Sequence, residues 1–272
     1  MTFWKPNEPL QVGSNFYTID IATGKIDRDK SPIRLNAVFE RNPFLRELPQ
    51  ELRAGFQEIV NGSSREYRRQ TDLRGGLNGS TTVHIVLRGC VAERTRIGSS
   101  STMRILGAGA VLGCMEVFDR RIPPPTATCL TDTWTISVPL ERMRTLAESN
   151  ASLMKAVGVS VTDRLEATER IYNRHGLKPV QRLAGLLAHL VMHCAVPAEE
   201  ADFRVEGPAQ SDLAEALSLS IGSVEAALKT LREDNTVLTG YRTYEFPSLR
   251  RLLETSAIQF PPESLAGALA AF

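Results

Sequence analysis

The stretch SDLAEALSLSIGSVEAALKTLRED (211–234) decides the fold of this chain. Its apolar residues recur every three or four positions in two blocks, the spacing of two helices that each bury one side. Ser218-Leu219-Ser220 predicts a short turn between them, and Ser220 suits the N-cap of the second helix. Ala214 is the small residue that lets the helices cross closely. A helix-turn-helix is predicted, although such helix pairs also occur in ordinary bundles. The inward-facing residues are Leu213, Leu217, Val224, Ala227, Leu228 and Leu231.

The flanking sequence extends this motif to a winged helix domain at residues 176–256. An apolar helix is predicted at 178–194, with Gly176 and Pro179 marking the boundary before it. The stretch TVLTGYRTYEF (236–246) predicts a hairpin that turns near Gly240, and PSLRRLLE (247–254) predicts a short helix. Residues 257–272 form a C-terminal tail that we expect to pack on this domain or on a partner.

Upstream of residue 149 the sequence is of another kind. Residues 1–34 are polar and predict an irregular arm, and the apolar spacing within 49–60 predicts a helix. Between 64 and 138, short β-type runs broken by glycines predict an antiparallel sandwich or barrel.

A long helix is predicted at 149–175, with Asn150 as its N-cap. Its apolar positions follow a spacing of three and four, as in a two-helix dimer seam. The alternative is that this seam packs on the β domain of its own chain. The seam residues are Met154, Val157, Val161, Leu165, Thr168 and Ile171.

Length and charge limit the class of protein. The 272 residues suggest two domains, and Lys+Arg 32 against Asp+Glu 31 gives a net charge of +1, so no global field attracts nucleic acid or membrane. The sequence has no transmembrane run and no secretory leader, which predicts a cytoplasmic protein without a membrane partner. The four cysteines are far apart, as expected for reduced thiols.

From about residue 36 to 254 the chain resembles the Crp/Fnr superfamily of bacterial transcription regulators. The stretches VHIVLRGCV (83–91), LGAGAVLGCMEVF (106–118) and PPTATCLTDTWTISVP (124–139) resemble parts of its β-roll. VQRLAGLLAHL (180–190) and FPSLRRLLE (246–254) resemble its DNA-binding domain. The resemblance implies an α+β fold: a cyclic-nucleotide-binding-like roll at 35–148, a dimerisation helix and a winged helix.

The resemblance places a ligand site at Gly113, Cys114, Glu116, Thr126 and Ala127. Nucleotide-binding members have a Glu where Cys114 stands and an Arg where Pro125 stands, and that Arg pairs with the phosphate. Arg120 or Arg121 with Glu116 would have to replace them. We therefore expect no response to cyclic AMP in the usual mode, and a roll that is a scaffold or takes an unknown effector. No cofactor is predicted.

Other sensing chemistry has weak support in the sequence. An iron–sulfur cluster needs about four converging thiolates, and no cysteine precedes Cys90. Thiol redox sensing at Cys114 or Cys129 stays open. His189, His193 and Cys194 lie on a predicted core helix without a nearby acid, so no metal is expected, and His84 has no support as a haem ligand.

The recognition helix departs from the family as well. The positions where the family has base-reading Arg, Glu and Arg hold Ile221, Gly222 and Ala226. Residues 176–256 carry a net charge of −3 and residues 1–175 carry +5, which is unusual for a DNA-binding domain. The candidate DNA contacts are Ser211, Ser220, Ser223, Glu225, Lys229 and Arg242, with the pair Arg250-Arg251 for backbone phosphates.

The leading hypothesis is a homodimeric transcription regulator that binds a palindromic DNA site, with RNA polymerase as a partner implied by the resemblance. The alternative is a regulator that keeps the dimeric fold, has lost DNA readout and acts through protein contacts. The sequence has no phosphate-binding loop, nucleophile elbow or metal-ligand motif, so an enzyme is not expected.

Overall fold

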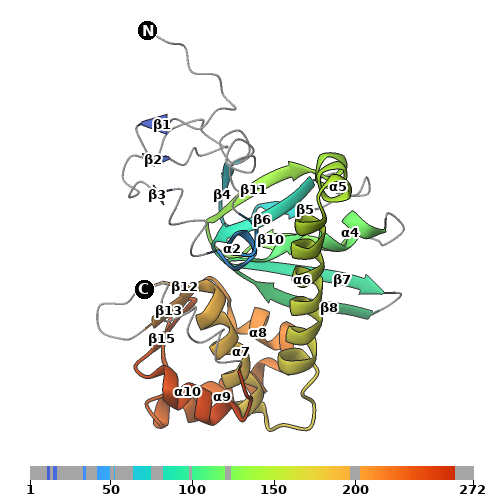
Figure 1. Ribbon diagram of the computed structural model, residues 1–272. Helices are drawn as coiled ribbons and strands as arrows, with labels where there is room; N and C mark the ends of the chain where they lie inside the picture. The colour runs from blue at the N-terminus through green and yellow to red at the C-terminus, as the bar shows by residue number, and fades with distance from the viewer. Residues whose placement is uncertain are drawn as a thin grey trace. The chain divides into compact units, whose positions relative to one another are not determined.

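The structure is a computed structural model that describes residues 11–12, 15–16, 33–34, 42–49, 52, 64–74, 82–97, 100–119, 124–196 and 203–260 (Figure 1). Its contacts group into two compact units, residues 1–89 with 108–162 and residues 90–107 with 163–272. This grouping differs from a division at residue 176. The second unit includes a hairpin from the roll sequence and the last part of the long helix.

The first unit is built on antiparallel strands. β4 (Ser64–Tyr67), β11 (Thr133–Pro139), β6 (Thr82–Arg88) and β9 (Val111–Leu112) form a sheet in that order, and β5 (Asp72–Arg74) pairs with β10 (Thr126–Cys129). In the register of β6 and β11, Ile136 lies opposite Ile85, and both side chains are fully buried. The β-rich character predicted for 64–138 is confirmed.

Helices cover the apolar side of these strands. They are α2 (Pro43–Arg46), α4 (Cys114–Phe118), α5 (Leu140–Ser149) and the first half of α6 (Ala151–Ala167). Met143 of α5 and Leu153 and Val157 of α6 join Ile85 and Ile136 in one hydrophobic core. Burying such side chains contributes roughly 1.5–3 kcal/mol each relative to exposure, so this core fixes the helices on the sheet.

The long helix starts as predicted and ends earlier. Asn150 accepts hydrogen bonds from the backbone N–H groups of Ser152 and Leu153 at 3.0 and 3.1 Å, which confirms its capping role. After α6 the backbone widens into a π-helix, η1 (Thr168–Tyr172), and Asn173 is the C-cap, three residues before the glycine expected to end the helix. π-turns inside helices are rare and frequently mark functional positions.

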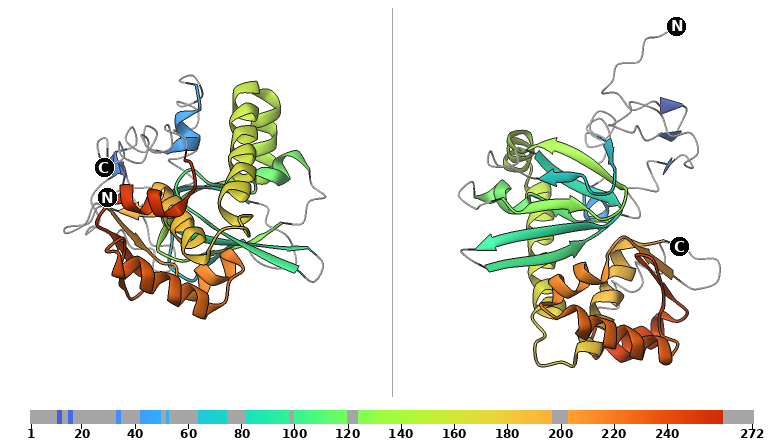
Figure 2. Two further views of the ribbon diagram at one scale, coloured as in Figure 1. Left: turned by 90° about the horizontal axis from the view of Figure 1, so that it is seen from below. Right: turned by 180° about the vertical axis from the view of Figure 1, so that it is seen from behind.

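The second unit is helical around α7 (Pro179–Cys194), which begins at Pro179 as expected. α8 (Gln210–Leu217), α9 (Ile221–Glu233) and α10 (Leu249–Ser256) pack against it, as both views of Figure 2 show. A small sheet has the order β12 (Ala195–Val196), β13 (Phe203–Glu206), β15 (Thr243–Phe246), β14 (Leu238–Gly240). The unit also holds the hairpin of β7 (Val91–Ile97) and β8 (Ser100–Leu106).

Three segments differ from the sequence-based expectation or lie outside the described residues. The arm predicted to be irregular contains a sheet of three two-residue strands, β1 (Gln11–Val12), β2 (Asn15–Phe16) and β3 (Ile33–Arg34). Strands this short leave no alternating pattern in a sequence. β13 was not predicted, because its alternation covers only four residues among acidic neighbours. The helix predicted at 49–60 lies almost wholly outside the described residues.

Candidate functional site

The helix-turn-helix has the geometry predicted from its sequence. Ser218 adopts a left-handed conformation and ends α8, and the N–H of Leu219 donates to the Ala214 carbonyl at 2.9 Å. Ser220 Oγ then accepts from the N–H of Ser223 at 3.0 Å and caps α9. Ala214 is buried where the helices meet, as its small size requires.

The wing follows α9 directly. β14 and β15 pair antiparallel from Leu238 opposite Glu245 to Gly240 opposite Thr243, and β13 extends the sheet on the other side of β15. Tyr241 at the tip is 86% exposed. A helix-turn-helix with a two-stranded wing is an arrangement that nucleic-acid-binding domains use.

Five of the six candidate DNA contacts lie on α8, on α9 or at the start of α9. Ser211, Glu225 and Lys229 are exposed on α8 and α9, with Lys229 Nζ 3.8 Å from a Glu233 carboxylate oxygen. Ser220 and Ser223 bond each other through their hydroxyls at 2.8 Å.

Arg242 differs from the other candidates, because its side chain points into the domain. Its Nη1 donates to the Gly207 carbonyl at 3.0 Å and lies 3.8 Å from Asp212, whose carboxylate caps the start of α8. Arg242 therefore positions the wing against α8 instead of presenting a free cation.

The β7–β8 hairpin is bonded to the helices of the second unit. Arg94 donates twice to the Glu215 carboxylate of α8, at 2.8 and 2.9 Å. Glu93 is buried in an ion pair with Arg164. The Tyr172 hydroxyl of η1 accepts from the N–H of Ile105 at 3.0 Å and donates to its carbonyl at 3.2 Å. The sequence carried no sign of these contacts, since each joins residues far apart in the chain.

Four of the five residues predicted for the ligand site are buried. Gly113 has φ +95°, a conformation that favours glycine, and it brings the chain into α4. Cys114, Glu116 and Ala127 are buried, and Thr126 is exposed on β10. Arg120 and Arg121, named as substitute cations, lie outside the described residues.

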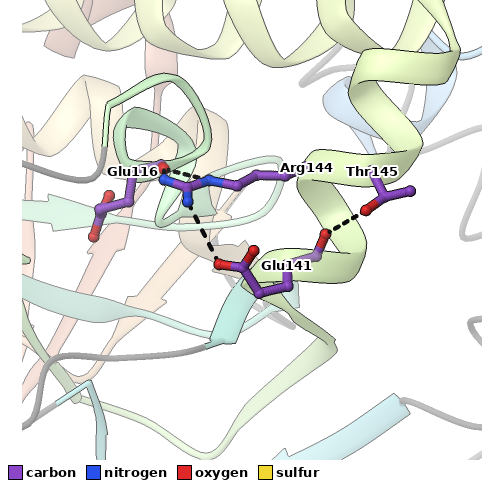
Figure 3. Close-up of polar contacts among 4 residues, drawn as sticks. All are labelled: Glu116, Glu141, Arg144 and Thr145. Carbon is purple, nitrogen blue, oxygen red and sulfur yellow. Dashed lines mark hydrogen bonds and ion pairs between the residues drawn. The ribbon is translucent and has the colours of Figure 1, made fainter.

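A guanidinium does reach this segment, from a residue that sequence reasoning missed. Arg144 of α5 donates through Nε at 3.1 Å and through Nη2 to the backbone carbonyl of Glu116, and its Nη1 lies 3.4 Å from Glu141 (Figure 3). Thr145 donates to the Glu141 carbonyl at 3.0 Å. The Arg144 side chain is only 8% exposed, so it fastens α4 to α5 and is not offered to a ligand.

The cysteines and histidines named as sensing candidates lie in surroundings typical of residues that stabilise the fold. Cys90, Cys114 and Cys129 are buried, and burial raises the pKa of the Cys129 thiol to about 11, which disfavours the reactive thiolate. His84 Nδ1 lies 3.0 Å from Ser137 Oγ inside the first unit, as in a satisfied core histidine.

His189 and His193 stack with ring centroids 4.6 Å apart. Among the described residues, no three metal-ligating side chains converge. Within that same part of the chain, no helix combines the length and apolar character needed to cross a bilayer.

The seam predicted for dimerisation is divided between the inside and the outside of the chain. Val157 and Ile171 are fully buried within the chain. Met154 and Val161 pack partly on the first core, Thr168 accepts from Arg104 Nε at 2.9 Å, and Leu165 is 63% exposed. Packing within the chain therefore accounts fully for two of the six seam residues and partly for two more.

The sequence matches no family model and no curated protein. Solved structures do match. A CRP-family transcriptional regulator from Thermus thermophilus superposes with a TM-score of 0.57 at 15% identity, over 71% of this chain and 96% of its own. FixK2 from Bradyrhizobium japonicum gives 0.58 at 16% identity, over 73% and 98%. The chain has the Crp/Fnr fold.

A third match is the c-di-GMP-responsive global regulator CLP of Xanthomonas campestris, with a TM-score of 0.53 at 20% identity over 72% of this chain and 99% of that one. The order of elements predicted from the sequence is thus confirmed as a Crp/Fnr fold, with a roll, a long helix and a winged helix-turn-helix. At these identities the matches establish the fold alone.

Proposed function

We propose that this chain is a transcription regulator, not an enzyme, that binds DNA through α8, α9 and the wing and acts on RNA polymerase. The observation that carries the proposal is α9 itself. This helix is capped by Ser220, buried along Val224, Leu228 and Leu231, exposed on its other side and followed by a wing. The shared fold with Crp/Fnr regulators supports the same assignment.

A homodimer is part of this proposal. Met154, Gly158, Val161 and Leu165 follow a 4-3-4 spacing on the side of α6 that is at least partly exposed, and a Cβ at Gly158 would meet no atom within 4 Å. This spacing suits a two-helix seam in which the glycine allows close approach. Two copies would present two recognition helices to a palindromic site with half-sites about one helical turn apart.

The test is selection of binding sites from random duplexes with purified protein at low salt. We expect an enriched palindrome. Lys229→Glu should weaken binding to it at least tenfold, because a charge reversal on the exposed side of α9 repels phosphate. The matched control is Arg142→Glu on α5, also an exposed cation, which should bind within twofold of wild type. Recovery of no enriched duplex would refute the proposal.

For the roll we propose a scaffold without cyclic AMP binding in the usual mode. Pro125 stands where a phosphate-pairing arginine is needed, and the Arg144 guanidinium is bonded to the Glu116 carbonyl. Cyclic AMP should leave the melting temperature unchanged. A ligand that binds the folded protein and is present at a hundred times its Kd would stabilise it by about 2.7 kcal/mol. A concentration-dependent rise with cyclic AMP would contradict this. The same assay with cyclic dinucleotides tests a different effector.

A second candidate function is regulation through protein contacts. Large apolar side chains are exposed on the winged helix at Ile221, Leu238 and Tyr241, and residues 176–256 carry a net charge of −3. This function predicts that no duplex is enriched, and that a partner captured by the wild type is lost with Tyr241→Asp and kept with Lys229→Glu.

A further inference from the structure

The exposed side of α9 has an unusual composition. Ile221, at the first helical position, is 52% exposed, and Gly222, Glu225, Ala226 and Lys229 share its side of the helix. The opposite side is buried in the domain. The half of the helix nearest its N-terminus thus presents the apolar side chains of Ile221 and Ala226, the carboxylate of Glu225, and a glycine without a side chain.

Nearby polar groups have partners inside the domain. Ser220 and Ser223 bond each other, Arg242 is bonded to Gly207, and Arg232 Nη1 donates to Thr239 Oγ1 at 3.1 Å. Lys229 lies beside Glu233. Arg232 is exposed in the last turn of α9 and bonded to the wing through Thr239, so the half of α9 nearest its N-terminus presents no arginine for the two-point contact that identifies guanine.

The base edges in a major groove offer a match to such a surface. The C5-methyl of thymine is the apolar group that this groove displays, and the N4 amino group of cytosine is a donor that a carboxylate accepts. We infer that α9 recognises its DNA site through thymine C5-methyl groups, contacted by Ile221 and Ala226, next to a cytosine amino group that donates to Glu225. This inference rests on the proposed function and names the bases that serve it.

Two observations favour base edges over a protein partner on this side of α9. A protein interface buries roughly 800 Å² per partner and centres on aromatic or arginine anchors. The half of α9 nearest its N-terminus offers one large apolar side chain, a methyl group and one carboxylate, which is too little for such a centre. A Cβ added at Gly222 would meet nothing nearer than Ser220 Oγ at 4.0 Å outside the adjacent chain, so the open space beside this glycine lets the first turn approach base edges closely.

The experiment starts from the site enriched in the duplex selection. Each thymine is replaced in turn by deoxyuridine, which removes the C5-methyl and nothing else. We expect a loss of about fourfold at one or two positions in each half-site, as for one buried methyl group. With Ile221→Ala, the loss at one of these positions should fall to within a factor of about 1.5.

Leu238→Ala is the matched control, because it removes a similar side chain, also exposed, from the wing. It should leave the penalty for deoxyuridine at every position as in the wild type. Selection with Glu225→Gln gives a second readout, since glutamine pairs with adenine: one cytosine of the site should change to adenine. Circular dichroism confirms that each variant is folded.

The outcomes separate the two claims. No enriched duplex overturns the proposed function, and the inference with it. An enriched duplex whose deoxyuridine forms all bind like the parent overturns the inference and leaves DNA binding intact. A penalty that Ile221→Ala and Ala226→Gly both leave unchanged also overturns it, because other groups then contact the methyls.

Discussion

Two buried arginines of this protein donate hydrogen bonds to backbone carbonyls near helix ends. Arg144 donates to the Glu116 carbonyl in α4, and Arg182 of α7 donates to the carbonyl of Leu217, the last residue of α8. Carbonyls near a helix end have no partner within the helix, so a guanidinium satisfies them. Burial lowers the pKa of Arg182, which shows that its charge is partly desolvated.

Replacing Arg182 tests this role. Arg182→Met keeps the apolar stem and removes the donor, and we expect the free energy of unfolding to fall by about 1–3 kcal/mol because the Leu217 carbonyl loses its bond. Urea denaturation measures the change. Arg250→Met is the control: Arg250 is 88% exposed beside Glu254, and its loss should leave the urea midpoint unchanged. Equal effects of the two variants would contradict the assignment.

His189 makes stability depend on pH. Burial, with the nearby His193 and Arg170, holds the pKa of His189 well below the ordinary value of 6.5. The folded protein keeps this ring neutral while the unfolded chain takes up a proton, so its contribution is complete above pH 6.5 and is lost as the pH falls.

The loss expected for wild type, relative to His189→Gln, is at most about 1.4 kcal/mol per pH unit below 6.5. Urea midpoints at pH 7.5 and 5.5 measure it. His175→Gln, at an exposed histidine, should keep the wild-type slope. If His189→Gln lost stability with falling pH as steeply as wild type, groups other than His189 would cause the pH dependence.

At the scale of elements, the long helix of α6 and η1 has one buried side and one open side. Val157 and Ile171 are occupied within the chain, whereas Leu165 is 63% exposed. Leu165→Glu should therefore convert a dimer to a monomer without unfolding it, because it places a charge in the seam and nothing in the core. Sedimentation velocity measures the species, and Val159→Glu, at another exposed apolar residue of α6, is the control expected to stay dimeric. A dimeric Leu165→Glu would refute the seam.

The elements also show what the sequence could and could not predict. α7, α8 and α9 were predicted within a residue or two, because each carries an apolar periodicity together with a cap or a breaker such as Ser220 or Pro179. Periodicity does not say which surface covers an apolar stripe, and in the structure two of the six predicted seam residues, Val157 and Ile171, are fully buried within the chain. The inward turn of Arg242 and the role of Arg144 depend on tertiary contacts that local sequence does not encode.

At the scale of the whole chain, an ion pair links residues 121 positions apart. Arg94 of β7 and Glu215 of α8 form a bidentate pair, about one-third and two-fifths exposed. Pairing in two places limits the motion of both side chains, although solvent screens the attraction. A double-mutant cycle of Arg94→Met and Glu215→Gln should give a coupling of about 0.5–1 kcal/mol.

The same cycle on Arg250 and Glu254 within α10 is the control. That pair is close, at 3.0 Å, but more exposed and singly bonded, so its coupling should be smaller. Equal couplings would show that the hairpin is not held to α8 by this contact.

The second unit is assembled from two separate stretches of chain, which has a consequence for its synthesis. The hairpin up to Gly107 leaves the ribosome before any residue of α7–α10 has been made. At about 5–20 residues per second, translation from Gly107 to Phe260 takes roughly 8–30 s. Until residue 172 has been made Ile105 has no Tyr172 to bond, and until residue 215 has been made Arg94 has no Glu215. The second unit is therefore completed only after α10 has been made, and in a chain arrested before α8 the hairpin does not have the Glu215 carboxylate to bond.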